Sequence, residues 1–369
     1  MTSKIKNLEV NLLIWFIMGS GVLGIFFNTA IASANVDAWM SPLIGMIFGL
    51  IPVLVILKLI NHDENLNINL LFEKKWGKFG KIISLTIALF VGTYVMLNFY
   101  NLTNFISSDY LYNTPRLFIS ILFIIPIIYV LSFNIIVISR TTMIFGIISI
   151  ILFSFAIVGV STQIVPNNIF PILKDGITPP IIAGLYYVCY IVFPLFLLTI
   201  IPKKLIRNNK KFNKRFIITY IISSLTLCLM TYLVLASYGI ELSLLYQYPE
   251  YNILKRISIL SLFDRIESII SLVLVLFIYT ACVIGCYYIK QTCFDVFKLE
   301  NDKKNNILIL ILIIVILIFG TTVFPNNTIG NVIVMNIYHI LLTIFFFIIP
   351  LILSFFIKKK SWLFQQIKY

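Results

Sequence analysis

The sequence has very little charge. Only 11% of its 369 residues are Asp, Glu, Lys or Arg, whereas a soluble domain carries roughly 25%. Histidine occurs twice, and the five cysteines have no spacing typical of a zinc site or a disulfide framework. Because 60% of the residues are apolar, this chain cannot cover its own surface in water, and we expect an integral membrane protein.

The same scarcity argues against catalysis. A membrane enzyme needs a nucleophile, a base or a metal centre built from convergent polar side chains. The sequence offers two histidines and scattered carboxylates without such a pattern. We therefore expect no enzyme activity, no catalytic residues, no cofactor and no bound metal.

Long apolar runs are what the sequence does have. A bilayer core of ~30 Å is crossed by ~20 helical residues, and ten runs roughly reach that length. They are too long and continuous for the strands of a β-barrel. The predicted spans are Leu12–Ile31, Met40–Ile60, Ile82–Phe105, Leu117–Ile138, Thr142–Val160, Pro180–Ile201, Phe216–Tyr238, Ser268–Tyr288, Ile307–Phe324 and Val332–Ile357.

The basic residues indicate an orientation for these spans. With ten crossings, 23 of the 28 Lys and Arg residues fall on one side and five on the other. The positive-inside rule then places both termini in the cytoplasm. The net charge of +14 is thus a signal of topology and of contact with membrane lipid, and we expect no nucleic-acid partner.

The chain reads as one membrane domain over residues 1–369, with helices 1–5 at about 10–162 and helices 6–10 at about 178–358. Asn65–Lys81 is either an interfacial amphipathic helix or a plain cytoplasmic loop. Tyr238–Glu267 is the longest outer segment, and its apolar spacing after Pro249 favours a short lid helix.

Two spans break the rules of helix composition. The first contains Gly19-Ser20-Gly21-Val22-Leu23-Gly24 near its middle, and the sixth carries Pro194 well inside. Glycine and proline both weaken a helix interior. The glycines alone are equally explained by close helix packing. Because spans one and six hold matching positions in a five-plus-five division, we favour an inverted repeat with helices 1 and 6 broken around a midplane ligand site.

Several short motifs carry a resemblance to a known family. They are Gly19-Ser20-Gly21-Val22-Leu23, Trp76-Gly77-Lys78 with Lys81, Asn113-Thr114-Pro115, Ile201-Pro202-Lys203-Lys204, and Leu262-Phe263-Asp264-Arg265-Ile266-Glu267-Ser268. With them, the chain resembles the spore germination permeases, the GerAB-type B subunits of nutrient germinant receptors in the amino acid–polyamine–organocation superfamily. The resemblance covers almost the whole chain.

That resemblance implies a leucine-transporter-like, all-α fold with ten transmembrane helices. It implies a receptor subunit of the spore inner membrane that binds a small nutrient, often an amino acid. It also implies an A-type subunit and a lipoprotein C-type subunit as partners. The alternative is a secondary amino-acid transporter of the same superfamily.

Candidate ligand-binding residues come from the breaks and from the faces beside them. Backbone N–H groups in the first break are suited to an anionic ligand group. Asn98 either contacts ligand or forms a hydrogen bond between helices. The predicted set is Gly19, Ser20, Gly21, Val22, Leu23, Tyr94, Asn98, Tyr190, Phe193, Tyr279 and Thr280.

Four further ionisable residues stand apart from this set. Asp264, Arg265 and Glu267 open the eighth span, where we expect them to form a gate or a subunit contact. His339 is the only histidine within a predicted span. For it we favour a structural hydrogen bond over a proton-linked role.

Overall fold

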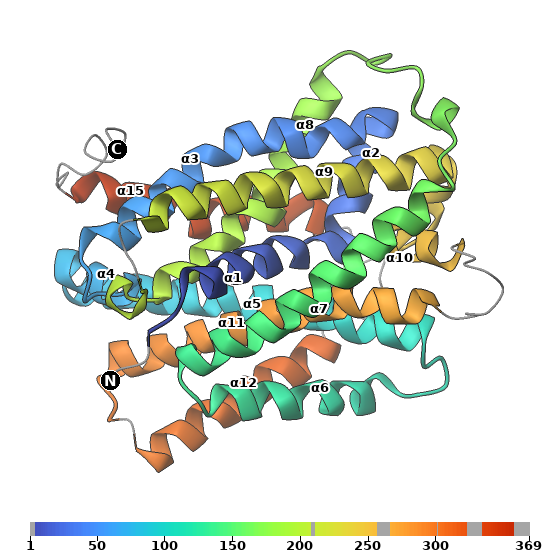
Figure 1. Ribbon diagram of the computed structural model, residues 1–369. Helices are drawn as coiled ribbons and strands as arrows, with labels where there is room; N and C mark the ends of the chain where they lie inside the picture. The colour runs from blue at the N-terminus through green and yellow to red at the C-terminus, as the bar shows by residue number, and fades with distance from the viewer. Residues whose placement is uncertain (1–3, 208–210, 257–265, 301, 323–333, 358–369) are drawn as a thin grey trace.

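The computed structural model describes residues 4–207, 211–256, 266–300, 302–322 and 334–357. These residues are almost entirely helical; the only β pairing among them is an isolated parallel bridge between Ile5 and Ile206. Figure 1 shows the long helices lying side by side along one common direction. The predicted all-α class is confirmed.

The first membrane segment is interrupted. It consists of α1 (Asn7–Ser20), a distorted turn η1 (Val22–Phe26) and α2 (Phe27–Ala34). The sixth predicted span also changes geometry along its length. It starts as α8 (Thr178–Tyr187) and continues as a π-helical turn, η4, and a 3-10 segment, η5.

The other elements fall close to the predicted spans. In chain order they are η2 (Asn35–Met40), α3 (Ser41–His62), α4 (Ile68–Trp76), α5 (Lys78–Asp109), α6 (Arg116–Leu131), α7 (Ile135–Ser161), η3 (Pro166–Ile169), η4 (Val188–Val192), η5 (Phe193–Ile200), η6 (Lys203–Leu205), α9 (Phe212–Leu245), α10 (Pro249–Asn252), η8 (Ile253–Arg256), α11 (Ile266–Phe297), α12 (Lys303–Thr322), η9 (Val334–Tyr338), α14 (His339–Thr343), η10 (Ile344–Ile348) and α15 (Ile349–Phe356). A helix does follow span two, at α4, and a short helix does begin at Pro249.

Eight helical segments among the described residues are long and apolar enough to cross a membrane. The first of them, Asn7–His62, contains both the first and the second predicted span. The apolar helix α6 has 16 residues and is shorter than the others. The count of ten crossings and the inverted repeat remain predictions.

The boundary between the fourth and fifth predicted spans is wrong. We placed Ile135–Ile138 at the end of span four, but these residues begin α7. The physical reason is the turn at Ser132-Phe133-Asn134. Asn134 has extended backbone at the N-cap of α7, with φ −82° and ψ 160° and no hydrogen bond from its side chain to the first turn, so the chain leaves the helical conformation here.

The broken first helix lies inside the bundle. Helix α1 contacts α7, α9 and α11, while α2 packs on α8. Figure 1 shows α1 between α3, α8 and α9 on one side and α5, α7 and α11 on the other. Helices α6 and α12 pack on each other and on α5 at the periphery. The first break is therefore enclosed by several helices.

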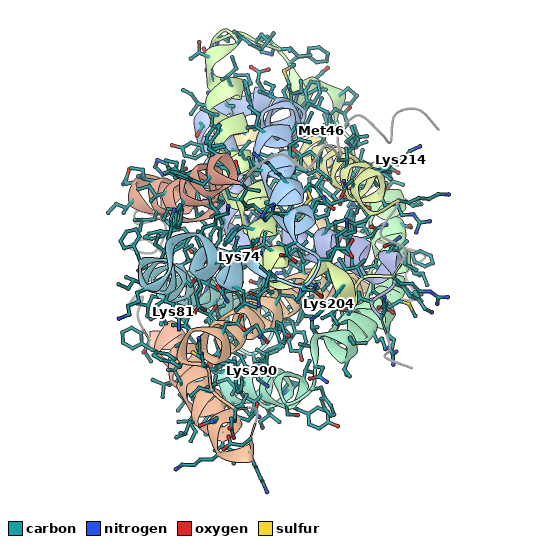
Figure 2. All side chains as sticks on the ribbon, turned by 90° about the vertical axis from the view of Figure 1, so that its left-hand side faces the viewer. Met46, Lys74, Lys81, Lys204, Lys214 and Lys290 are labelled. Atoms are coloured by element: carbon teal, nitrogen blue, oxygen red, sulfur yellow. The ribbon has the colours of Figure 1, made fainter. Side chains whose placement is uncertain are left out.

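Basic side chains gather at one end of the bundle. Figure 2 looks onto this end, with Lys74, Lys81, Lys204 and Lys214 coming from four different segments. The amino end of α1 and the carboxyl end of α15 lie at the same end. This clustering is what the positive-inside rule expects of a cytoplasmic face.

The orientation is testable with two single cysteines at opposite ends of α9. Lys214 and Leu245 are both exposed. In a background without the five native cysteines, we expect Lys214→Cys to react with an impermeant thiol reagent only from the cytoplasmic side. Leu245→Cys should react only from outside. Reaction of Lys214→Cys from outside would contradict the predicted topology.

Candidate ligand-binding site at the broken helices

The break in the first membrane segment centres on Leu23 and Gly24. Leu23 has a non-helical ψ of 114°, and Gly24 has a left-handed φ of 67°. Glycine adopts that conformation without steric cost, which explains why the chain turns here. The backbone then rejoins a helix, with the Phe26 N–H donating to the Gly21 carbonyl at 3.1 Å.

Glycine is also needed here for close approach. A Cβ on Gly21 would lie 2.5 Å from the Tyr190 carbonyl oxygen, and a Cβ on Gly19 would lie 2.6 Å from the Phe277 ring. The break of the first helix is thus pressed against the π-helical turn of the sixth. The two explanations that the sequence left open, a broken helix and close helix packing, therefore both apply.

The sixth span is distorted at the level where the first is broken. The π-helical turn η4 precedes Pro194, which stands at the start of η5. Tyr190 stacks on Tyr186 with ring centroids 6.1 Å apart, and Phe193 stacks on Phe347 at 5.3 Å. Both predicted aromatic residues are buried here, with Tyr190 nearest to the break.

Three predicted residues form one buried polar group. The Ser20 hydroxyl lies 3.0 Å from the Tyr94 hydroxyl and donates to the Ile17 carbonyl at 2.7 Å. The Asn98 amide nitrogen donates to the Tyr94 carbonyl at 2.9 Å. The Asn98 Oδ1 atom is buried without a hydrogen-bond partner in the described part of the chain. A buried acceptor left unpaired costs free energy, so this atom marks a position suited to a donor from a ligand.

Helix α11 supplies the other two predicted residues. Thr280 is buried, and its hydroxyl likewise makes no hydrogen bond within the described residues. Tyr279 packs edge-on against Phe145 of α7, with ring centroids 6.0 Å apart. The structure thus brings Ser20, Tyr94 and Asn98 together and directs Tyr279 toward a different helix.

For His339 we favoured a structural hydrogen bond, and its Nδ1 atom makes none among the described residues. That atom is buried, while the ring packs edge-on against Tyr186 at 5.5 Å. Asp264 and Arg265 lie outside the described residues. Glu267 falls in the first turn of α11, and its side chain also lies outside the description. Their predicted gate or subunit role remains a prediction.

The sequence predicted a lid helix after Pro249 but not its contact with the break. We define the outer lid as Tyr248–Arg256, which contains α10 and η8. The Gly24 N–H donates to Glu250 Oε1 at 3.1 Å, and Asn104 Nδ2 donates to the Tyr248 hydroxyl at 2.7 Å. The lid therefore touches the break directly. The only signal in the sequence was a carboxylate directly after Pro249, in the segment where a lid helix was expected.

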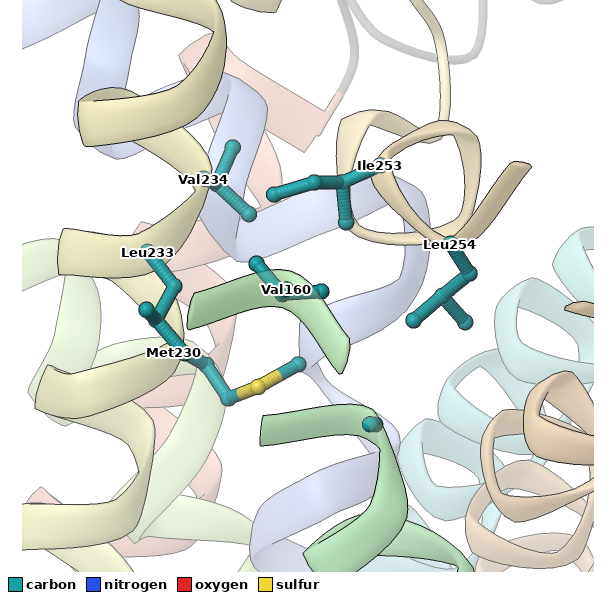
Figure 3. A pocket seen from close by; sticks show the side chains of 7 residues that line it. Val160, Met230, Leu233, Val234, Ile253 and Leu254 are labelled. Carbon is teal, nitrogen blue, oxygen red and sulfur yellow. The ribbon is translucent and has the colours of Figure 1, made fainter. Parts of the chain in front are cut away.

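The space beneath the lid is small. Two cavities adjoin it, with volumes of about 10 and 30 Å³. Figure 3 shows the smaller, where Ile253 and Leu254 of the lid face Val160 and Met230. A cavity must have a volume of roughly 10–15 Å³ to hold one water molecule. These cavities are therefore far too small to hold an amino acid. The lid is closed over the break in this structure.

The fold is shared with a solved transporter. Two structures of a manganese transporter from Eremococcus coleocola are similar to this chain, one of a point variant and one in complex with an aromatic bis-isothiourea substituted compound. Each has a TM-score of 0.55, covering 96% of this chain and 82% of the transporter, at 13% and 12% sequence identity. The leucine-transporter-like architecture is thereby confirmed.

Sequence comparison gives the family. No individual curated protein matches this chain. The family described as spore germination protein matches over residues 5–329. That match spans most of the chain, from the amino end of α1 to beyond α12. It agrees with the motifs quoted above, and the chain therefore belongs to the spore germination protein family.

Proposed function

We propose that this permease-like membrane protein is the B subunit of a spore nutrient germinant receptor. It binds a small nutrient, an amino acid by preference, at the break of helices 1 and 6. The observation that carries the proposal is the buried group of Ser20, Tyr94 and Asn98, with its unpaired acceptor, directly beside a backbone break. Unpaired polar atoms next to irregular backbone at membrane depth are typical of a ligand site.

The chemistry of the site suits a zwitterion. Backbone N–H groups of the break are suited to the ligand's carboxylate, and one of them, the Gly24 N–H, already donates to a carboxyl oxygen of Glu250. The unpaired Asn98 oxygen accepts from an ammonium group, and Tyr190 and Phe193 supply an apolar wall for the ligand side chain. No covalent step is required, and we propose binding without catalysis.

Family membership supports the proposed partners and location. On this basis the chain sits in the spore inner membrane, with both termini in the cytoplasm, beside an A-type subunit and a lipoprotein C-type subunit. Asp264, Arg265 and Glu267 are the residues we propose for a gate or a subunit contact. Adjacent reading frames for the two other subunits would support this assembly.

Secondary amino-acid transport is the second candidate. The observation that favours it is the similarity in fold to a transporter over 96% of this chain. Uptake of labelled amino acid into vesicles containing the purified protein separates the two functions. Saturable uptake by the purified protein, together with normal germination of spores that lack the gene, would favour the transporter. If deleting the gene abolishes the germination response to the nutrient and the purified protein shows no measurable uptake, the receptor function is favoured.

The hydroxyl pair at the break gives a graded test. One net hydrogen bond is worth about 1 kcal/mol, or roughly fivefold in affinity. We expect Tyr94→Phe and Ser20→Ala each to raise the effective nutrient concentration about fivefold, and the double variant to add little more. The measurement is a germination dose–response, with protein abundance determined by immunoblot.

A matched control is available in the same fold. Tyr187 and Ser224 form a second buried Tyr–Ser hydrogen bond, at 2.8 Å, between α8 and α9. Tyr187→Phe removes the same kind of hydrogen bond at a position where we propose no contact with the ligand. We therefore expect an unchanged dose–response. Equal shifts in Tyr94→Phe and Tyr187→Phe would mean that the first pair acts only through stability.

A further inference from the structure

Glu250 is an unusual residue for a lid. Its side chain is completely buried, with a relative exposed area of 0%, although it belongs to a short connecting helix. Carboxylates are almost never fully buried unless they are paired. Here Oε1 accepts a hydrogen bond from the Gly24 N–H of the helix-1 break, and the backbone N–H of Glu250 itself also interacts with the carboxyl group.

The second carboxyl oxygen of Glu250, Oε2, lacks a hydrogen-bond partner in the described part of the chain. Glu250 lines the cavity of about 30 Å³, whose other lining residues are all apolar. The other wall residues include Val22 at the break, Met230 of α9 and Phe277 of α11. An ionised carboxylate in such surroundings would be strongly disfavoured.

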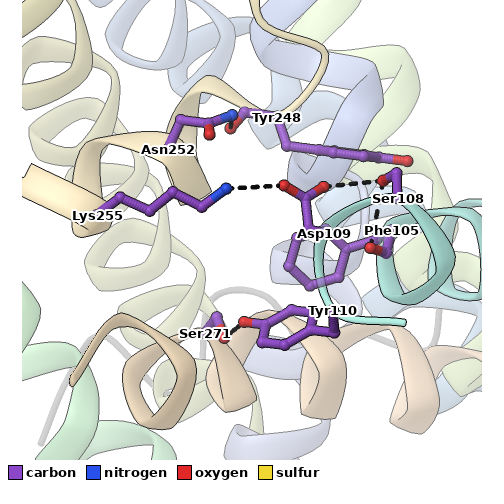
Figure 4. Close-up of polar contacts among 8 residues, drawn as sticks. All are labelled: Phe105, Ser108, Asp109, Tyr110, Tyr248, Asn252, Lys255 and Ser271. Carbon is purple, nitrogen blue, oxygen red and sulfur yellow. Dashed lines mark hydrogen bonds and ion pairs between the residues drawn. The ribbon is translucent and has the colours of Figure 1, made fainter. Parts of the chain in front are cut away.

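The neighbouring charges do not offset the cost of ionising the buried Glu250. On the α5 side, Asp109 is a like charge, and it is paired with Lys255 of the lid at 3.1 Å (Figure 4). The cavity-lining residues from η1, α7, α9 and α11 carry no titratable group. Burial is the main cause that raises the pKa of Glu250, to about 8, against the smaller opposing effects of its own N–H and that of Gly24.

The lid is held by contacts around this carboxyl group. Figure 4 shows the end of α5, where Asp109 binds Lys255 of the lid. Tyr251 of the lid also packs edge-on against Phe105 of α5, with ring centroids 5.0 Å apart. Directly before the lid, Asn28 Nδ2 of α2 donates to the Gln247 carbonyl at 3.0 Å. Glu250 is thus a buried acid within a docked surface segment, and undocking that segment would return the acid to water.

We propose that Glu250 is a proton-binding site that couples closure of the outer lid to the uptake of one proton from the outer solution. In the closed lid, Oε2 carries the proton, and Oε1 accepts from the Gly24 N–H as the carbonyl oxygen of a neutral acid. Opening exposes the carboxyl group, which releases that proton to water. This coupling does not depend on the identity of the nutrient.

The direction of the pH dependence follows from the two states. The carboxyl pKa is about 8 in the closed lid and near the ordinary 4.5 in the open one. Because the closed-state pKa is the higher, the closed lid has its full stability below pH 4.5 and loses it as the pH rises through 8. Between these values the open-to-closed ratio increases about tenfold per pH unit.

The test measures lid opening directly. Leu254 is on the lid and buried, whereas Leu245 on α9 is 74% exposed. Each is replaced by cysteine, separately, in a chain without native cysteines, reconstituted into nanodiscs so that both faces are accessible. The rate of labelling by a methanethiosulfonate reagent is measured from pH 5 to 9 without nutrient. Dividing the Leu254→Cys rate by the Leu245→Cys rate removes the pH dependence of thiol ionisation.

We expect the ratio to rise about tenfold per pH unit from pH 5 and to level off near pH 8. Glu250→Gln keeps the acceptor for Gly24 but cannot ionise, so its ratio should be low and independent of pH. Glu241→Gln, which changes an exposed carboxylate at the end of α9, should follow the parent. A flat profile in the parent, or a parent-like profile in Glu250→Gln, would overturn the proposal. The parent profile alone decides the matter if the glutamine variant fails to fold.

Discussion

Gly21→Val should abolish the nutrient response while the protein remains in the membrane. The added side chain would begin 2.5 Å from the Tyr190 carbonyl oxygen and 2.9 Å from Ile191 Cδ1. The first of these is a backbone atom, so a change of rotamer cannot relieve the clash. The break of helix 1 and the π-helical turn of helix 6 must therefore separate, which dismantles the proposed site.

A matched pair of smaller changes isolates this effect. A Cβ on Gly92, in the middle of α5, would meet no atom within 4 Å. We expect Gly21→Ala to impair the response severely and Gly92→Ala to leave it unchanged. The measurements are a germination dose–response and immunoblots of spore membranes. A parent-like response in Gly21→Val would refute the site at the break and leave its glycines as packing residues only.

Tyr248→Ala should have the second largest effect, because it removes the main anchor of the outer lid. The ring is 2% exposed and packs edge-on against Phe105 with centroids 5.1 Å apart. Truncating a buried aromatic residue costs about 3–5 kcal/mol. If that cost falls on the closed, ligand-bound state, the effective nutrient concentration should rise at least a hundredfold, at about 1.4 kcal/mol for each factor of ten.

Tyr248→Phe is the control for this change. It keeps the packing and loses only the hydrogen bonds that the hydroxyl accepts from Asn104 at 2.7 Å and from Gln247 at 3.2 Å. At about 1 kcal/mol for each bond, we expect a shift of roughly 5- to 25-fold. Both variants are compared by dose–response and by thermal unfolding of the detergent-solubilised protein. Equal shifts for alanine and phenylalanine would show that the ring does not hold the lid.

Local patterns in the sequence were enough to predict most of the fold. Apolar runs located the helices, and the cluster from Gly19 to Gly24 located the first break. The pattern did not reveal which glycine needs its conformational freedom. Gly21 has an ordinary φ of −77°, whereas Gly24 is the left-handed residue. Backbone conformation at a break depends on what packs against it, here Tyr190 and the lid, and neither contact is visible in local sequence.

The candidate site was only partly predictable for the same reason. Tyr94 and Asn98 share one face of a helix, and that spacing is visible in the sequence. The contact between Gly24 and Glu250 joins residues 226 positions apart, and no spacing rule connects them. Tyr338 was likewise missed as a site residue, although its buried hydroxyl lies close enough to Tyr94 and Tyr190 to interact electrostatically with them.

The 3-10 segment η5 makes helix 6 longer than an α-helix of the same residues would be. Its eight residues, Phe193–Ile200, extend ~16 Å at ~2.0 Å per residue, whereas an α-helix of the same residues would extend ~12 Å. The segment is thus about 4 Å longer than the corresponding α-helix. Just beyond it, Ile206 is bridged to Ile5, with the Arg207 N–H donating to the Ile5 carbonyl at 2.7 Å. Any rewinding of η5 would therefore pull on the amino end of helix 1, and would carry a change at the break to the opposite face of the membrane.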